Sequence, residues 1–241
     1  MRLAVLSDIH GNLPALEAVI ANARARGADA FVNLGDSVSG PLWPRETAAL
    51  LMALGWPTLA GNQDRQVVQE HLATMGASDR FARERLGPAQ LAWLATLPST
   101  LEYAADIFLC HGTPASDSAY LLEDVGEDGA YPAAPGAVAE RLAGRRERLT
   151  LCGHSHLARL LWLADGRTVA NPGSVGLPAY ADPLPHWHVM ESGTPRARYA
   201  LVEDGAVDLL EADYDFAAAS AKARAEGRGD WSFALATGRA R

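Results

Sequence analysis

Five short apolar segments of this chain each end in a group of Asp, Asn or His residues, and this pattern limits the fold more than any other feature. The polar groups are D-x-H (Asp8, His10), G-D (Asp36), G-N-Q-D (Asn62, Asp64), C-H-G (His111) and G-H-S-H (His154, His156). Apolar runs of about four to eight residues are typical of buried strands. In open α/β sheets, ligands bind at the carboxyl ends of the strands. We therefore expect these side chains to meet at one edge of the fold.

The first quarter of the chain alternates strand-like and helix-like segments. Residues 2–7 predict a buried strand, and residues 12–27 predict a helix with Pro14 in its first turn and Gly27 as its stop. A strand over 30–36, a helix around 44–54 and a strand over 57–62 follow. This βαβαβ order predicts parallel strands joined by helical crossovers.

The rest of the chain is richer in strands and hairpins. We expect helices over 63–75 and 78–96, and strands over 106–112, 148–156, 158–164 and 167–174. Residues 197–214 predict a hairpin because Asp204-Gly205 separates two alternating apolar runs. From about residue 215 we expect a helix and then a frayed tail. The sequence thus predicts one domain over residues 1–241, of the mixed α/β (α+β) class.

Composition excludes several other classes of protein. A net charge of −8 gives no bulk attraction for nucleic acid, and the densest basic stretch, at 144–148, is explained by a solvated helix end. No apolar run reaches the roughly 18 residues of a membrane span. The apolar segment at the N-terminus is also too short for a signal peptide, so we expect a cytoplasmic protein. In that compartment Cys110 and Cys152 are expected to be buried thiols.

The types of the strand-end residues predict a metal site. Carboxylate and imidazole groups together suit Zn, Mn, Fe or Ni. Taken singly, each residue has an ordinary structural explanation; Asp8 could cap a helix and Asn62 could occupy a turn. Seven candidate ligands are too many for one ion, and Asp36 is the natural bridge between two; the seven are Asp8, His10, Asp36, Asn62, His111, His154 and His156.

In this order the motifs resemble those of the calcineurin-like metallophosphoesterase superfamily. The segment NPGSVG at 171–176 is similar to one in its small bacterial and archaeal phosphodiesterase-like members. The resemblance implies a four-layer αββα sandwich, in which two mixed β-sheets are flanked by helices. It also implies two divalent metal ions about 3.5–4 Å apart, with Mn²⁺ favoured and Fe, Zn or Ni as alternatives. Asp8, His10 and His156 would hold the first ion. Asn62, His111 and His154 would hold the second, and Asp36 would bridge both.

The activity implied by the resemblance is hydrolysis of a small phosphodiester or phosphomonoester by a hydroxide that bridges two metal ions. Asn62 would also orient a phosphate oxygen through its amide hydrogens. Three alternatives share the same core: a protein phosphatase, a dinucleoside-polyphosphate hydrolase and a non-catalytic metal-binding scaffold. The complete ligand set argues against the scaffold.

The sequence departs from the family pattern at residue 63. Many members have a histidine after the asparagine, where it is thought to assist the leaving group, but here the residue is Gln63. Glutamine donates a hydrogen bond but cannot act as a general acid, which favours substrates with good leaving groups. The next residue, Asp64, either orients the motif loop or caps a helix.

The segment PHWHV at 185–189 has two alternative interpretations. His186 and His188 could belong to a substrate lid that contacts the substrate and provides a proton donor, or to an ordinary exposed loop or strand. Tyr180 and Trp187 could stack on a base or aryl group of the substrate, or serve in packing.

Overall fold

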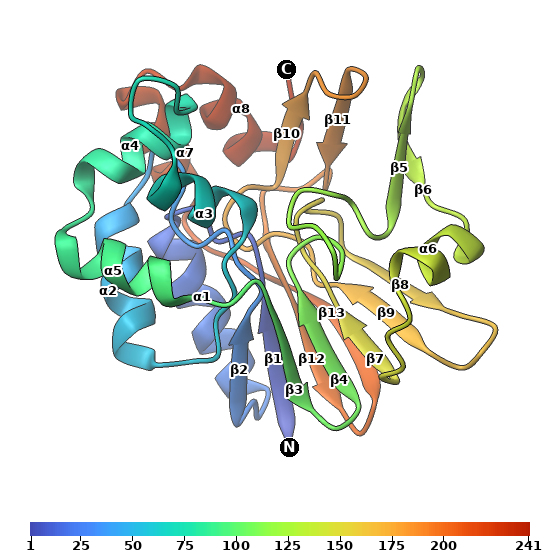
Figure 1. Ribbon diagram of the computed structural model, residues 1–241. Helices are drawn as coiled ribbons and strands as arrows, with labels where there is room; N and C mark the ends of the chain where they lie inside the picture. Colours follow the sequence, from blue (N-terminus) through green and yellow to red (C-terminus); the bar gives the residue numbers. More distant parts are fainter.

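The computed structural model describes residues 1–241 and contains two mixed sheets with helices outside them (Figure 1). The first sheet has the order β13-β12-β1-β2, with β1 (Arg2–Leu6), β2 (Ala30–Asn33), β12 (Ala197–Glu203) and β13 (Ala206–Ala212). β1 runs parallel to β2 and antiparallel to β12. The second sheet has the order β3-β4-β7-β9-β8, with β3 (Thr100–Ala104), β4 (Ile107–Cys110), β7 (Leu149–Leu151), β8 (Arg159–Trp162) and β9 (Thr168–Asn171).

The two sheets pack face to face because the side chains on their facing sides are apolar and buried. Leu3 and Val5 of β1 share one buried cluster with Leu109 of β4 and Leu151 of β7. Successive residues of a strand point to opposite faces, so the neighbours of Leu3 and Val5 point away from the second sheet.

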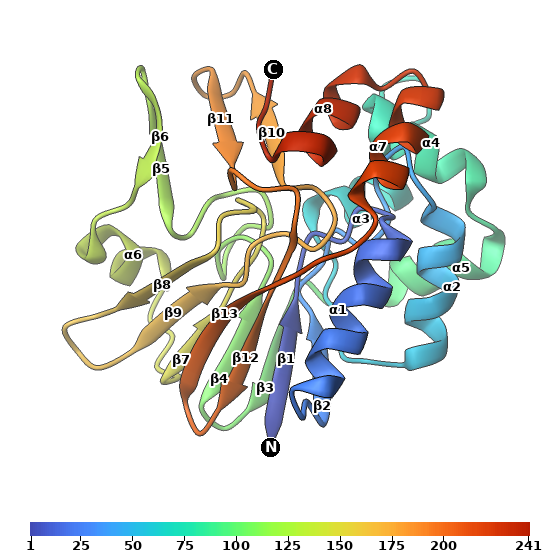
Figure 2. The ribbon, with the colours of Figure 1, turned by 180° about the vertical axis from the view of Figure 1, so that it is seen from behind.

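Helices cover the outer face of each sheet. Leu6 packs with Leu16 of α1 (Leu13–Ala25) and Leu51 of α2 (Pro44–Leu54) on the outer side of the first sheet. Phe108 packs with Val138 of α6 (Pro135–Arg141) on the outer side of the second. Figure 2 shows α1 and α2 on one side of the paired sheets and α6 on the other. This arrangement confirms the predicted four-layer αββα sandwich.

The remaining elements gather mainly beyond the carboxyl ends of β1 and β2 (Figure 1). They are α3 (Asn62–Gln69), α4 (Ala77–Arg85), α5 (Pro88–Thr96), α7 (Phe216–Ala225), α8 (Gly229–Thr237) and the hairpins β5 (Glu123–Gly126)–β6 (Gly129–Pro132) and β10 (Ala179–Asp182)–β11 (His188–Glu191). No helix of the structure is both long enough and apolar enough to span a membrane.

Several predicted elements have different bounds. The strand expected over 57–62 is reduced to one parallel bridge between Asn33 and Thr58, because the chain enters α3 at Asn62. The helix expected over 63–75 ends at Gln69, and the one expected over 78–96 is two helices. Pro88 begins the second of them, since it has no N–H to continue the first. The predicted strands over 106–112, 148–156, 158–164 and 167–174 are all shorter in the structure.

The C-terminal region corrects one prediction and confirms another. Two helices, α7 and α8, replace the expected single helix and frayed tail, because Trp231 and Leu235 of α8 are buried against α7 and β10. The hairpin over 197–214 is confirmed as β12–β13. Asp204 and Gly205 both have positive φ, at 51° and 83°, as a tight hairpin turn of this type requires.

Candidate metal centre

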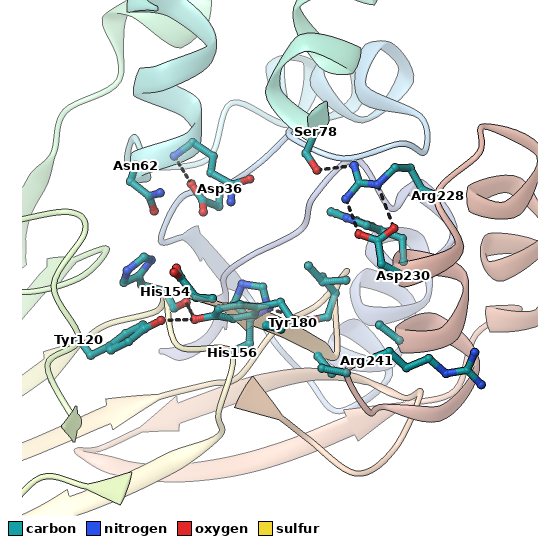
Figure 3. Close-up of a pocket in the computed structure, with 18 of the residues that line it drawn as sticks. Asp36, Asn62, Ser78, Tyr120, His154, His156, Tyr180, Arg228, Asp230 and Arg241 are labelled. Carbon is teal, nitrogen blue, oxygen red and sulfur yellow. Dashed lines mark hydrogen bonds and ion pairs between the residues drawn. The ribbon is translucent and has the colours of Figure 1, made fainter. Parts of the chain in front are cut away.

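The structure brings the predicted ligand residues together at one edge of the sheets. Two groups form there, Asp8 with His10 and His156, and Asp36 with His111 and His154. Within each group the ligand atoms lie within 4.8 Å of one another. The groups adjoin, because His111 Nε2 lies 3.4 Å from Asp36 Oδ2 and 3.9 Å from Asp8 Oδ1. Asn62, at the start of α3, lies beside Asp36 (Figure 3).

The backbone at these positions is strained. Five of the candidate ligands have φ in the left-handed region, between 52° and 69°: Asp8, His10, Asp36, His154 and His156. This conformation costs an L-residue about 1–2 kcal/mol, and such strain clusters at functional sites. Hydrogen bonds between the loops hold it in place, including Asp8 N–H to the Gly35 carbonyl at 2.9 Å.

Backbone carbonyls fix the orientation of three imidazole rings. The Nδ1 atoms donate hydrogen bonds of 2.7–2.9 Å, from His10 to Ser39, from His111 to Leu34 and from His156 to Leu177. A carbonyl can only accept, so Nδ1 carries the proton and, in the neutral ring, Nε2 presents a lone pair. A histidine that binds a metal usually donates its other ring N–H to a carbonyl or carboxylate in this way.

The resulting arrangement of lone pairs fits a cation. His10 Nε2 and His156 Nε2 lie 3.1 Å apart, so two lone pairs face each other. Three further buried ligand atoms have no hydrogen-bond partner: Asp8 Oδ1, Asn62 Oδ1 and His111 Nε2. Buried polar atoms rarely stay unpaired, because leaving them so costs about 1–3 kcal/mol each. Divalent ions that accept mixed nitrogen and oxygen donors would satisfy all five atoms.

Charge at the site is concentrated around His111. Burial alone would lower the pKa of His111, but the carboxylates of Asp36 and Asp8 outweigh it and raise that pKa to about 10. Burial lowers the pKa of His10 and that of His154 to about 4. The buried carboxylates of Asp8 and Asp36 attract a divalent cation, and because the pKa of His111 is raised, an ion bound there would displace the proton of that ring.

The α3 helix begins at the site, and Asp64 holds its first turn in place. The Asp64 carboxylate accepts hydrogen bonds from Gly61 N–H at 3.2 Å and from Ser37 N–H at 3.0 Å. It therefore both caps the helix and ties it to the loop after Asp36. Gln63 N–H donates to Asp36 Oδ1 at 2.9 Å, while its own side-chain Oε1 is buried without a partner.

The segment NPGSVG joins two ligand loops. Gly176 N–H and the Ser174 hydroxyl both donate to the Asp8 carbonyl, at 2.9 and 2.8 Å. Asn171 Nδ2 donates to the Gly153 carbonyl at 2.7 Å, immediately before His154. The segment thus fixes the Asp8 loop relative to the His154 loop.

The two histidines of PHWHV do not line the site. His186 is exposed, and His188 is buried behind Tyr120, with its Nε2 3.0 Å from the Tyr120 hydroxyl. A further hydrogen bond of 2.8 Å links Tyr120 to Tyr180, which donates to the His154 carbonyl. No motif or periodicity in the sequence identifies Tyr120 as a residue of the site.

A cavity of about 430 Å³ extends from the ligand residues. Figure 3 shows Asp36, Asn62, His154 and His156 on one side of it, and Ser78, Arg228, Asp230 and Arg241 on the other. The candidate ligand residues therefore line one end of a larger pocket.

Comparison with known proteins gives consistent matches. The family model described as the calcineurin-like phosphoesterase superfamily domain matches residues 1–191. A metallophosphoesterase from Sphaerobacter thermophilus has a similar structure, with a TM-score of 0.77, 26% identity and 99% of each chain covered. A hypothetical protein from Pyrococcus horikoshii OT3 has a TM-score of 0.78 at 20% identity, over 98% of each chain. An uncharacterized protein from Methanocaldococcus jannaschii is 24% identical over 239 residues, 88% of each chain.

Proposed function

Because this chain belongs to the calcineurin-like phosphoesterase superfamily, we propose that it hydrolyses a phosphodiester or phosphomonoester with the help of two divalent metal ions. The observation that carries the proposal is the distance of 3.1 Å between His10 Nε2 and His156 Nε2. In each ring the other nitrogen, Nδ1, donates its hydrogen to a backbone carbonyl, so Nε2 is left to face the neighbouring ring. Two neutral imidazoles in this arrangement repel each other unless a cation accepts both lone pairs.

The two groups of side chains support an assignment of each candidate ligand to one of the two ions. Asp8, His10 and His156 would hold one ion, and His111 and His154 would hold the other together with Asn62. Asp36 is the proposed bridge, because its carboxylate lies 3.4 Å from His111 and the two groups adjoin there. Mn²⁺ is the proposed metal, with Fe, Zn or Ni as alternatives that the same donors suit.

When bound, such ions lower the pKa of water to near neutrality and neutralise charge on phosphoryl oxygens. The chain itself would position the reactants. The Asn62 amide group donates one hydrogen toward Gln66 Oε1, at 3.4 Å, and has a second hydrogen that can donate to a phosphoryl oxygen. Gln63 lines the pocket and can donate a hydrogen bond to the leaving oxygen, although it cannot give up a proton.

The test is a metal-dependent assay with a matched control. Protein stripped with a chelator should lose hydrolysis of bis-p-nitrophenyl phosphate and p-nitrophenyl phosphate, and Mn²⁺ should restore it. Asp36→Asn should reduce turnover to background, whereas the exposed His71→Ala should match the unmodified protein. Activity that survives exhaustive chelation, or equal turnover in the two variants, would overturn the proposal.

A further inference from the structure

We infer that the end of the pocket away from the metal ligands binds a flat, uncharged organic group of the substrate, such as an aryl ring or a nucleobase. The inference rests on the proposed function, because it assumes that the phosphoryl group lies at the metal site. It concerns the specificity of that site.

The pocket has room for such a group. Its volume of about 430 Å³ falls within the roughly 300–1,000 Å³ typical of sites for drug-sized ligands. The candidate ligands occupy one end only, and the rest is lined by hairpin β10–β11, by α8 and by the residues that follow α8. A phosphoryl group at the metal site would leave that space for the rest of the substrate.

Aromatic rings lead from the metal ligands into this space. Tyr180 lies edge-on to His156, with ring centroids 4.7 Å apart, and Trp231 lies edge-on to His10 at 5.7 Å. Farther out, Trp187 lines the pocket from hairpin β10–β11 with 61% of its surface exposed. A large exposed aromatic ring beside a pocket provides a stacking surface for a planar group.

The charges at this end balance, which argues against a second phosphate. Four charged side chains line it, the cations Arg228 and Arg241 and the anions Asp182 and Asp230. Arg228 is already paired with Asp230 at 2.6 and 3.0 Å and donates to Ser78 at 2.9 Å. No surplus positive charge remains for a polyphosphate chain. The pocket therefore fits a single phosphoryl group with a neutral organic group better than a dinucleoside polyphosphate.

This wall of the pocket is held in place by hydrogen bonds. Gly193 N–H donates to the Gly238 carbonyl at 2.9 Å, and Ala240 N–H donates to Glu191 Oε1 at 2.8 Å. These contacts fix the segment after α8 against the end of hairpin β10–β11. A preformed wall avoids the entropy cost of ordering a loop around the ligand.

The test measures the affinity of phosphate monoesters for the Mn²⁺-loaded protein as inhibition constants against bis-p-nitrophenyl phosphate in initial-rate assays, because these monoesters are themselves proposed substrates. Phenyl phosphate and methyl phosphate differ only in the organic group, so their affinity ratio reports on stacking. We expect phenyl phosphate to bind about tenfold tighter, which corresponds to about 1.4 kcal/mol, because its ring can stack on an aromatic side chain. Trp187→Ala should reduce the ratio severalfold and Trp187→Phe should largely restore it. Trp162→Ala, which removes an equally exposed Trp (70%) outside the pocket, should leave it unchanged.

A second comparison tests the charge argument. AMP and ADP share the nucleoside, and we expect ADP to gain no more than severalfold in affinity. A phenyl-to-methyl ratio near one, or the same ratio in Trp187→Ala and Trp162→Ala, overturns the inference while leaving phosphoester hydrolysis intact. ADP binding more than tenfold tighter than AMP overturns it in favour of a second phosphate subsite. If no monoester binds and no ester is hydrolysed, the proposed function itself has failed.

Discussion

Gly176→Ala is expected to disrupt the metal site through the backbone, without changing any ligand. A Cβ atom at Gly176 would lie 1.7 Å from the Ile9 carbonyl oxygen, whereas such contacts essentially never fall below 3.0 Å. The backbone between Asp8 and His10 must therefore move by about 1.3 Å. The shift also weakens the hydrogen bonds from Gly176 N–H to Asp8 and from Asn12 to the Gly176 carbonyl, both 2.9 Å.

The expected magnitudes follow from these contacts. Overpacking costs about 1–3 kcal/mol and each of the two hydrogen bonds about 1 kcal/mol, so the free energy of unfolding should fall by about 3–5 kcal/mol. Displacing ligands by about 1 Å should lower kcat/KM by roughly 10²-fold and weaken Mn²⁺ binding.

Urea denaturation and Mn²⁺ calorimetry measure both effects. Gly136→Ala is the matched control, because its Cβ would meet nothing within 4 Å and the residue lies in α6. That control should be as stable as the unmodified protein or slightly more stable. A Gly176→Ala protein with unchanged stability and Mn²⁺ affinity would refute the reasoning.

Three further outcomes are expected. Gln63→His should flatten the dependence of rate on leaving-group pKa across a series of aryl and alkyl esters. The new side chain can donate a proton to the leaving group, while the hydrogen bond from the backbone N–H of residue 63 to Asp36 remains. A shallow slope in the unmodified enzyme would contradict this. Burial raises the pKa of Asp79 to about 6, so ionisation of this group lowers the stability of the fold progressively between about pH 4 and pH 6, and the full loss is present above pH 6. Asp79→Asn should therefore raise the free energy of unfolding by about 1–2 kcal/mol at pH 8 but not near pH 4. Urea titrations at both pH values measure this difference. An equal change at both pH values would contradict the raised pKa of Asp79. Burial also raises the pKa of Cys110 and that of Cys152, so neither thiol should react with a disulfide reagent until the protein unfolds. Rapid labelling of the folded protein would be inconsistent with the structure.

Local signals explain which elements could be predicted. The α2 helix follows from Pro44 and an amphipathic pattern, and the β12–β13 hairpin follows from Asp204-Gly205. The break before Pro88 also has a local signal, because proline is favoured at the first position of a helix but cannot continue one. By contrast, α8 depends on burial of Trp231 against distant residues, and no local pattern distinguishes it from a tail.

The same distinction applies to the site. The ligand residues could be brought together from the sequence because each follows an apolar run that ends at the same edge. The existence of two packed sheets could not be derived from strand order and came from the family resemblance. Tyr120 reaches the pocket along an irregular loop that no sequence pattern marks. The sequence leaves two alternatives for Trp187, stacking on the substrate or packing, and only its position in the pocket lining separates them. Such contacts depend on tertiary structure alone.

Anomalous diffraction from crystals soaked in Mn²⁺ would show directly whether the chain holds two metal ions. We expect two peaks per chain, one among Asp8, His10 and His156 and one beside His111 and His154, with Asp36 between them. Crystals of Asp36→Asn should lose the peak pair or show only weak density. Unmodified crystals with no anomalous density at these side chains, despite the Mn²⁺ soak, would rule out the two-metal site.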